Sequence, residues 1–348
     1  MNLFSIYLAC KRGDLAMFEQ FSTGNIDLNA TDEKGLAPIH YACQEGTPVI
    51  VKALIERGAD ITAKTPLGLA PIHYACKNGH LEVLKLLIAN NRAVLDAKDS
   101  AGAAPIHFAC EGGHLKILVA LLNHGASAKS KTKSGMAPIH FACKNGHLAV
   151  LRALVANNST VLNSQDRTGA APVHYACQGG HLGIVEELVK RGASIKAETK
   201  SGRAPIHFAC ENGHLELVKA LISTYKIDVN TADNSNQTLI HGACREGQLE
   251  VVRALIANGA DTTAKDWDQR TPTHMACISG HSEILKILIT KDASDINAKD
   301  DNGVAPIHCA CGNGHVKALE VLLANTNVDV NANVWGKVRF TMHVKKVI

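Results

Sequence analysis

The chain has 348 residues, of which 46% are hydrophobic, 20% are charged and only 4% are aromatic. So few aromatic side chains disfavour an all-β sandwich and suit packed helices built from Leu, Ile, Ala and Val. The 36 basic and 32 acidic residues leave a formal charge of +4, which is too balanced to indicate nucleic acid or an anionic membrane as the main partner. The sequence has no apolar run near the roughly 20 residues that cross a bilayer.

The N-terminal segment MNLFSIYLAC contains a short apolar stretch. A secretory signal peptide places basic residues before such a stretch and a small-residue cleavage site after it, and the segment shows neither. We therefore interpret the segment as folded protein and expect no signal peptide or transmembrane segment.

A string close to Pro-Ile-His-x-x-Cys recurs along nearly the whole chain. Its histidines are alternately 33 and 34 residues apart, which indicates an internal structural repeat. These motif histidines are His40, His73, His107, His140, His174, His207, His241, His274 and His308.

Each repeat has the pattern of two short helices followed by a turn. Pro38 lacks a backbone donor and fits the first turn of a helix, and Gly46 fits the left-handed residue that ends one. Residues 81–88 then place their apolar side chains on one stripe of a second helix. A polar segment that begins at residues such as Gly58 leads to the next repeat, so the unit is helix, turn, helix and β-like hairpin.

This unit resembles the ankyrin repeat, which has a period of 33 and a Thr-Pro-Leu-His-x-Ala core. The matching stretches include GLAPIHYACQEG from Gly35, GLAPIHYACKNGHLEVLKLLI from Gly68 and GMAPIHFACKNGHLAVLRALV from Gly135. The resemblance covers residues 1–335 and implies an all-α repeat solenoid, elongated and curved, in which β-hairpin loops join helix-turn-helix units. No unit of this size buries its own apolar stripe, so each must stack on its neighbours.

The repeats divide the chain into three parts. We expect an N-terminal capping repeat in residues 1–31 and nine repeats in residues 32–332. In residues 333–348, apolar and polar side chains alternate, which predicts a partial repeat or a strand-like tail. The nine repeats are expected to start near residues 32, 65, 99, 132, 166, 199, 233, 266 and 300.

Every second connection after the second helix is one residue longer, as in NNRAVLDAKD compared with ERGADITAKT. We expect the longer connections to protrude on one face.

The 18 His and 11 Cys residues suggest metal or disulfide chemistry, but nearly all occupy repeat positions. One His and one Cys per repeat spread these side chains too far apart for a zinc site or a disulfide. We therefore expect no metal and buried, reduced thiols, which indicates the cytoplasm or the nucleus.

Each motif also holds His and Cys at positions i and i+3, a spacing that suggests a catalytic pair. An active site is singular, whereas this pair is repeated, so we assign it to architecture and expect no catalytic residue, no cofactor and no enzymatic activity. The resemblance implies that the motif histidine bonds within and between neighbouring hairpins.

The resemblance also implies a Thr that caps the first helix and bonds the motif histidine. Only Thr238 and Thr271 keep it, and each missing cap should cost about 1 kcal/mol of stability. The remaining repeats have Ala37, Ala70, Ala104, Ala137, Ala171, Ala204 and Ala305 at this position.

Residues that vary between repeats are candidates for a binding surface, since shared packing does not fix them. They lie at predicted hairpin tips and at the ends of first helices, where ankyrin proteins usually meet a partner. Trp267 is the strongest candidate, because Trp at an exposed tip is typical of interface hot spots. The others are Lys133, Lys200, Arg167, Met136, Arg203, Arg270, Lys77, Lys144 and Arg245, with Lys34, Leu67, Asp268, Trp335, Glu111 and Glu211 at equivalent positions.

The residue after the motif histidine is aromatic in six successive repeats. These side chains either line a concave binding groove or fill space between first helices. The six aromatic residues are Tyr41, Tyr74, Phe108, Phe141, Tyr175 and Phe208.

A cationic stripe runs from Lys129, Lys131 and Lys133 to Lys196, Lys200 and Arg203. It suggests either an acidic partner or a solvated face.

Four asparagines precede hairpin glycines by six residues. Turn chemistry explains them, although the family is also hydroxylated on asparagine in this region. They are Asn29, Asn163, Asn230 and Asn297.

We expect a non-catalytic, monomeric scaffold or adaptor that binds a protein partner and neither nucleic acid nor membrane. The alternative is a recognition fragment of a larger protein whose effector or enzyme domain lies elsewhere.

Overall fold

The computed structural model describes residues 2–23 and 26–332 of the chain. These residues form twenty α-helices, two 3-10 helices (η1 and η2) and no named strand. In chain order the elements are α1 Asn2–Arg12, α2 Leu15–Phe21, α3 Pro38–Glu45, α4 Pro48–Glu56, α5 Pro71–Asn78, α6 Leu81–Asn90, η1 Arg92–Asp96, α7 Pro105–Glu111, α8 Leu115–Asn123, α9 Pro138–Lys144, α10 Leu148–Asn157, η2 Ser159–Asn163, α11 Pro172–Gln178, α12 Leu182–Lys190, α13 Pro205–Glu211, α14 Leu215–Ser223, α15 Leu239–Arg245, α16 Leu249–Ala257, α17 Pro272–Ser279, α18 Ser282–Lys291, α19 Pro306–Gly312 and α20 Val316–Leu323.

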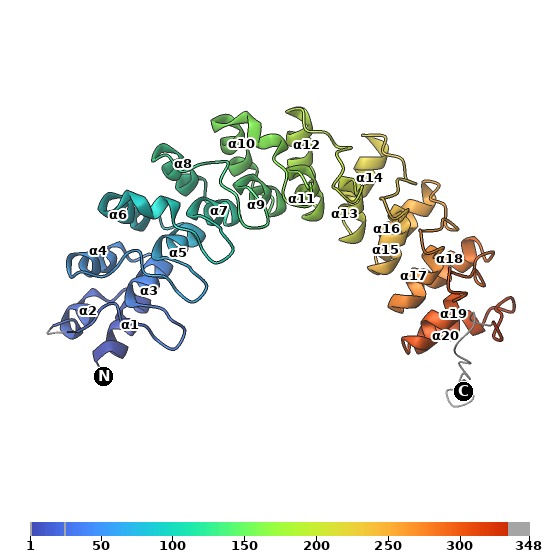
Figure 1. Ribbon diagram of the computed structural model, residues 1–348, viewed down its shortest axis with the longest axis horizontal. Helices are drawn as coiled ribbons and strands as arrows, with labels where there is room; N and C mark the ends of the chain where they lie inside the picture. The colour runs from blue at the N-terminus through green and yellow to red at the C-terminus, as the bar shows by residue number, and fades with distance from the viewer. Residues whose placement is uncertain (1, 24–25, 333–348) are drawn as a thin grey trace. The chain divides into compact units, whose positions relative to one another are not determined.

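The chain forms two compact units. Unit 1 spans Met1–Pro172 and Glu186–Ala193, and unit 2 spans Val173–Val185 and Ser194–Ile348. Within unit 1, the first helices α1, α3, α5, α7 and α9 contact one another in chain order, and the second helices form a parallel row (Figure 1). Within unit 2, α13, α15, α17 and α19 stack in the same way beside α14, α16, α18 and α20. This neighbour-to-neighbour packing confirms the all-α repeat solenoid.

The N-terminal segment is part of the fold. It forms α1, which packs against α2 and α3 and buries Ile6, Ala9 and Cys10. The expected strand-like tail and Trp335 lie outside the described residues.

The first helices begin and end as their sequence predicts. Pro38 occupies the first turn of α3 after an extended residue, Ala37, and Gly46 ends the helix with a left-handed φ of 72°. Gly46 is also required by close packing, because a Cβ there would lie 2.1 Å from Nδ1 of His80 in the next repeat. Both the left-handed helix end and the close packing of the next repeat therefore require glycine at position 46.

The motif histidines join each helix to the following hairpin. The backbone N–H of Ala37 donates to Nδ1 of His40 at 3.0 Å, so the proton lies on Nε2, which donates to the carbonyl of Ala63 at 3.0 Å. His73, His107 and His140 repeat this arrangement. The histidine role implied by the resemblance is confirmed.

A second set of histidines joins each repeat to the preceding one. His80, in the turn before α6, contacts the carbonyl of Gln44 at 2.8 Å through Nε2, and His114 contacts that of Lys77 at 2.8 Å. Gln248 replaces this histidine in one repeat and donates to the carbonyl of Glu211 at 2.9 Å. Each repeat is therefore fastened to both neighbours by side-chain hydrogen bonds.

The asparagines do more than form turns. Oδ1 of Asn230 accepts from the N–H of Asp261 at 2.9 Å, while its Nδ2 donates to the carbonyl of Gly259 at 3.3 Å. Asn29 and Asn297 make the same paired bonds to the repeat that follows them. Turn chemistry alone was an incomplete interpretation, because these amides link neighbouring repeats.

Two of the longer connections bury part of their length. After α6 and α10 the connection includes the 3-10 helices η1 and η2. Val94 and Leu95 of η1 are buried, as are Val161 and Leu162 of η2, whereas residues 91–93 are exposed. Protrusion of the longer connections stays a prediction.

Candidate protein-binding surface

The hairpins form a hydrogen-bonded ladder in each unit. In unit 1 the N–H of Ser100 donates to the carbonyl of Leu67 at 2.9 Å, and that of Lys133 to Ala101 at 2.8 Å. In unit 2 the N–H of Trp267 donates to the carbonyl of Ser235 at 3.0 Å. These bonds fix the backbone of each tip relative to the next, although the described hairpins are hydrogen-bonded turns with one isolated bridge and no strand.

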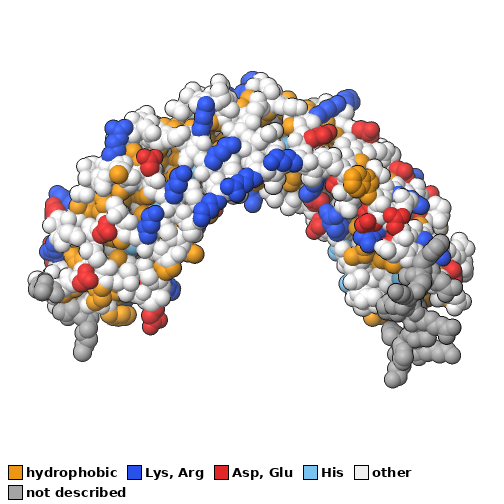
Figure 2. Space-filling model, in the orientation of Figure 1, with side chains coloured by type: hydrophobic (Ala, Val, Ile, Leu, Met, Phe, Trp, Pro, Cys, Tyr) orange, Lys and Arg blue, Asp and Glu red, His pale blue; other side chains and the backbone are white. Residues whose placement is uncertain are grey.

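Most predicted tip residues of unit 1 are exposed. Lys34, Lys133 and Arg167 lie at the surface, and the side chain of Leu67 is 65% exposed. Met136 is half-buried. On the face drawn in Figure 2, Lys and Arg side chains gather over α7 and α9, with few acidic side chains among them.

Trp267 is the largest exposed apolar side chain at a described tip of unit 2, at 71% exposure. Its backbone is held by the ladder bond to Ser235, while the following residues Asp268 and Arg270 form an ion pair of 3.2 Å. Lys200 is also exposed, whereas Arg203 and Arg270 are half-buried. An indole on a fixed backbone has the geometry of an interface anchor.

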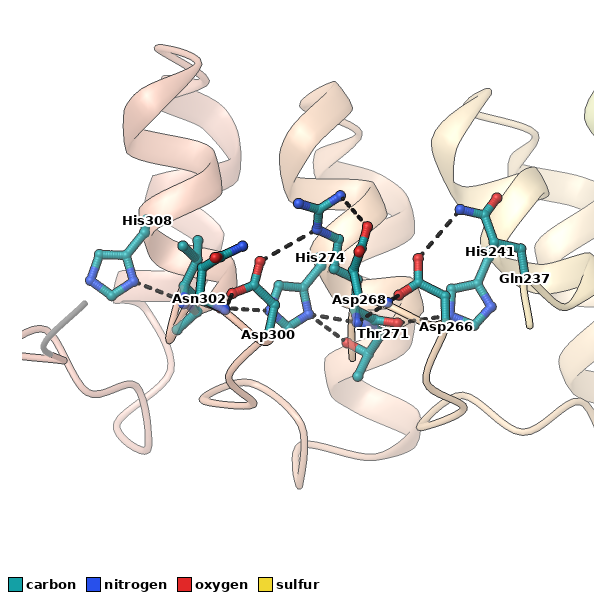
Figure 3. A network of polar contacts seen from close by, with 12 residues as sticks. Gln237, His241, Asp266, Asp268, Thr271, His274, Asp300, Asn302 and His308 are labelled. Atoms are coloured by element: carbon teal, nitrogen blue, oxygen red, sulfur yellow. Dashed lines mark hydrogen bonds and ion pairs between the residues drawn. The ribbon is translucent and has the colours of Figure 1, made fainter. Parts of the chain in front are cut away.

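Buried aspartates hold the hairpins around Trp267, and Figure 3 shows Asp266 and Asp300 among their polar partners. Oδ1 of Asp266 accepts from the N–H groups of Asp268 and Arg270 at 3.0 and 2.8 Å, and Oδ2 accepts from Gln237 at 3.3 Å. Asp300 repeats the pattern and pairs with Arg270 at 3.4 Å. Each aspartate thus binds its own turn and the preceding repeat.

The predicted helix-end residues of unit 2 form a charged cluster. Glu211 pairs with Arg245 at 2.7 Å and with Arg203, and Arg245 also donates to Gln237 at 2.8 Å. Gly242 permits this cluster, because a Cβ there would lie 3.0 Å from Cγ of Glu211. In unit 1 the equivalent Lys77 and Lys144 are exposed and Glu111 is half-buried.

The same glycine alters the environment of His207. In earlier repeats an aromatic ring packs edge-on against the preceding motif histidine, as Phe208 does on His174 at 5.5 Å. Because residue 242 is glycine, no aromatic ring packs on His207 from this position. Nε2 of His207 is buried without a hydrogen-bond partner. Burial and the nearby Arg203 cation lower the pKa of His207 to about 4.

The ring contacts described for five of the six aromatic residues lie between first helices. The rings of Tyr74, Phe108 and Phe141 lie 5.8, 5.1 and 5.6 Å from the motif histidine of the preceding repeat. Tyr41 is only 6% exposed, whereas the other five, Tyr175 included, are half-buried and keep some ring surface. Their contact with a partner stays a prediction.

The repeated His–Cys pairs are not arranged as nucleophile and base. Burial lowers the pKa of His40 below its ordinary value, and both ring nitrogens are engaged with backbone groups. Burial also raises the pKa of Cys43, which keeps the thiol protonated. A protonated thiol is a poor nucleophile, and an imidazole with both nitrogens bonded to the backbone does not act as its base.

Within residues 2–23 and 26–332 no group of three or more His, Cys, Asp and Glu side chains is placed to hold a metal ion. No helix in this described part of the chain is long and apolar enough to cross a membrane.

The family model described as "Ankyrin repeats (3 copies)" matches residues 6–99, 51–132, 106–199, 174–266 and 265–334. The chain belongs to the ankyrin-repeat family. No curated protein matches it. Ankyrin repeats are generally protein–protein interaction modules, so the exposed tips are the natural candidate surface.

Two polar groupings were missed by sequence reasoning about the ankyrin repeats. Glu187 of α12 accepts from Arg152 at 2.9 Å and from Arg191 at 2.6 Å, and these bonds lower its pKa to about 2. The Arg203–Glu211–Arg245 cluster is the second. The only signal for the latter was the loss of the aromatic residue at Gly242, which marks where the repeat departs from its pattern.

Proposed function

We propose that this ankyrin-repeat chain is a non-catalytic scaffold or adaptor that binds a partner protein through its hairpin tips and the ends of its first helices. The single observation that carries the proposal is Trp267, an indole that is 71% exposed on a hydrogen-bonded hairpin. Exposing a large aromatic side chain has a solvation cost that a partner's surface would relieve.

A pull-down from cytosolic extract tests this proposal by comparing the parent with Trp267→Ala. Val119→Ala, which truncates an exposed apolar side chain on α8, is the matched control. We expect a partner that the parent and the control retain and that Trp267→Ala loses, with affinity reduced about 30-fold. Equal capture by all three proteins would remove Trp267 from the interface, and no specific capture would contradict the binding function.

The cysteines support a reducing compartment, and we propose the cytoplasm or the nucleus. Ten of the eleven are buried and Cys311 is half-buried, and all are thiols. We also propose a monomer. Light scattering coupled to gel filtration tests this state directly, and a mass near twice 37.0 kDa would contradict it.

A further inference from the structure

The central repeats of unit 1 contain a stretch without acidic residues. Residues 112–165 include Lys116, Lys129, Lys131, Lys133, Lys144 and Arg152 but no Asp or Glu, although the chain as a whole has 32 acidic residues. This segment covers α8, the following hairpin, α9, α10 and η2. The near-neutral charge of the chain therefore conceals a strongly basic region.

Basic side chains of this segment and of the two flanking hairpins lie on adjacent hairpins. Lys98, Lys129, Lys131, Lys133 and Arg167 are all exposed, and we call them the cationic hairpin face. Figure 2 shows Lys and Arg side chains gathered over α7 and α9, beside these hairpins. Backbone bonds join the hairpins, from Lys133 N–H to Ala101 and from Arg167 N–H to Ser134 at 2.8 and 2.9 Å.

In the described part of unit 1, the ion pairs do not involve the cationic hairpin face. The ion pairs described for unit 1 lie on second helices: Lys52–Glu56, Lys85–Glu82, Arg152–Glu187 and Arg191–Glu187. Lys131 donates to the carbonyl of Gln165 at 2.9 Å, and among the described residues the other four members have no ion-pair partner.

The carboxylates of the neighbouring hairpins are occupied by backbone groups. Asp99 accepts from the N–H of Ala103 at 2.7 Å, and Asp166 accepts from those of Thr168 and Ala170 at 2.8 and 2.9 Å. These bonds hold the two hairpin turns, and both carboxylates keep their negative charge. The five cations of the cationic hairpin face outnumber these two carboxylates, so the face keeps a net positive charge on a fixed backbone.

We propose that the cationic hairpin face binds an extended acidic segment of a partner protein. This proposal rests on the protein-binding function proposed above. Stacked repeats place successive hairpins about 10 Å apart. An extended peptide in the polyproline II conformation rises about 3.1 Å per residue with three residues per turn, so every third side chain lies on the same face about 9 Å further along. A carboxylate at every third residue therefore meets one hairpin after another. A single-stranded nucleic acid fits less well, because none of the five members is aromatic and base stacking needs aromatic side chains.

Fluorescence anisotropy with the full chain tests the proposal. The probe is a labelled 15-residue peptide with Glu at every third position, and its Gln counterpart is the neutral control. We compare the parent with Lys129→Gln/Lys133→Gln/Arg167→Gln and with the charge-matched control Lys52→Gln/Lys85→Gln/Lys116→Gln on second helices. We expect the hairpin variant to bind the Glu peptide about tenfold more weakly than the parent, while the control binds within about twofold.

Three results of the peptide assay overturn the inference. They are equal binding of the Glu and Gln peptides by the parent, equal weakening by both triple variants, and tighter binding of an oligothymidylate of equal charge. Melting curves of both variants establish that they are folded. If the hairpin variant still captures the natural partner that Trp267→Ala loses, the acidic-segment inference fails while the protein-binding function stands.

Discussion

At the scale of single residues, the histidines are the main polar support of the fold. The motif imidazoles of His40 to His274 are buried, and in most repeats the ring accepts a backbone proton at Nδ1 and donates through Nε2 to the next hairpin. Only a neutral imidazole can accept at Nδ1 and donate through Nε2, because the protonated ring has no acceptor nitrogen. This requirement couples the stability of the protein to pH.

We predict that the chain loses stability as the pH falls from about 6.5 to about 4. Burial lowers the pKa of His40, His73, His107, His140, His207, His241 and His274 in the folded state. The unfolded chain therefore binds more protons than the folded chain in this window, so acid favours unfolding. For His207, with a pKa of about 4, the loss is about 3 kcal/mol.

Urea unfolding at pH 7.5, 5.5 and 4.5 measures this dependence. His207→Gln should reduce the slope of stability against pH, because it removes one titrating group. A midpoint that does not change between pH 7.5 and 4.5 would show that the buried histidines do not control acid stability.

The residues that precede the first helices carry a second prediction. Thr238 and Thr271 do not cap the backbone with their side chains, and their hydroxyls instead bond Nδ1 of His241 and His274 at 2.8 and 3.0 Å. The capping rationale was therefore wrong in part, but the bond to the histidine remains. Ala104→Thr with Ala137→Thr should each stabilise the fold by about 1 kcal/mol and raise the melting temperature.

The matched control is Val at the same two positions, since Val has the shape of Thr without the hydroxyl. Calorimetry of both double variants separates the hydrogen bond from the added volume. A Thr variant that melts at or below the Val variant would show that the hydroxyl contributes nothing.

At the scale of elements, the connections between repeats decide the stacking. The amide of Asn230 makes two bonds to the next repeat. Asn163, at the end of η2, occupies the equivalent sequence position but makes no such pair in the described structure. Asn163 belongs to a 3-10 helix, whereas Asn230 does not, so the local backbone differs.

We predict that Asn230→Ala destabilises the chain by about 2 kcal/mol, since two inter-repeat hydrogen bonds are lost. Asn163→Ala is the control and should cost less than half as much. Chemical denaturation of the two variants measures the difference. Equal costs would assign Asn230 to its own turn rather than to the inter-repeat contact.

At the scale of the whole molecule, each repeat contacts only its neighbours within its unit. Stability in such an array is approximately the sum of repeat and interface contributions. A core defect should therefore act locally. The consequence distinguishes this chain from a globular protein of the same length.

We predict that Leu118→Ala, in the buried face of α8, costs about 3 kcal/mol and lowers amide protection in α7 to α10 while leaving α17 to α20 unchanged. Hydrogen exchange resolved by mass spectrometry measures both regions. Uniform loss of protection in both units would indicate one cooperative unit and contradict the nearest-neighbour description.

The sequence alone determined the repeat, its helix boundaries and its class, because the period, the prolines and the glycines act through local geometry. It also identified Trp267 as an exposed tip residue, since position within the repeat decides exposure. Local rules did not reveal which groups 30 or more residues apart would meet.

Only the tertiary structure showed the inter-repeat bonds of Asn230, the cluster around Glu211 and the burial of Val94 and Leu95 in η1. It also showed that Asp99 and Asp166 accept hydrogen bonds from their own turns, beside the exposed cations of the cationic hairpin face. Each of these depends on distances between neighbouring repeats. Stacking sets those distances, and a one-dimensional pattern does not record them.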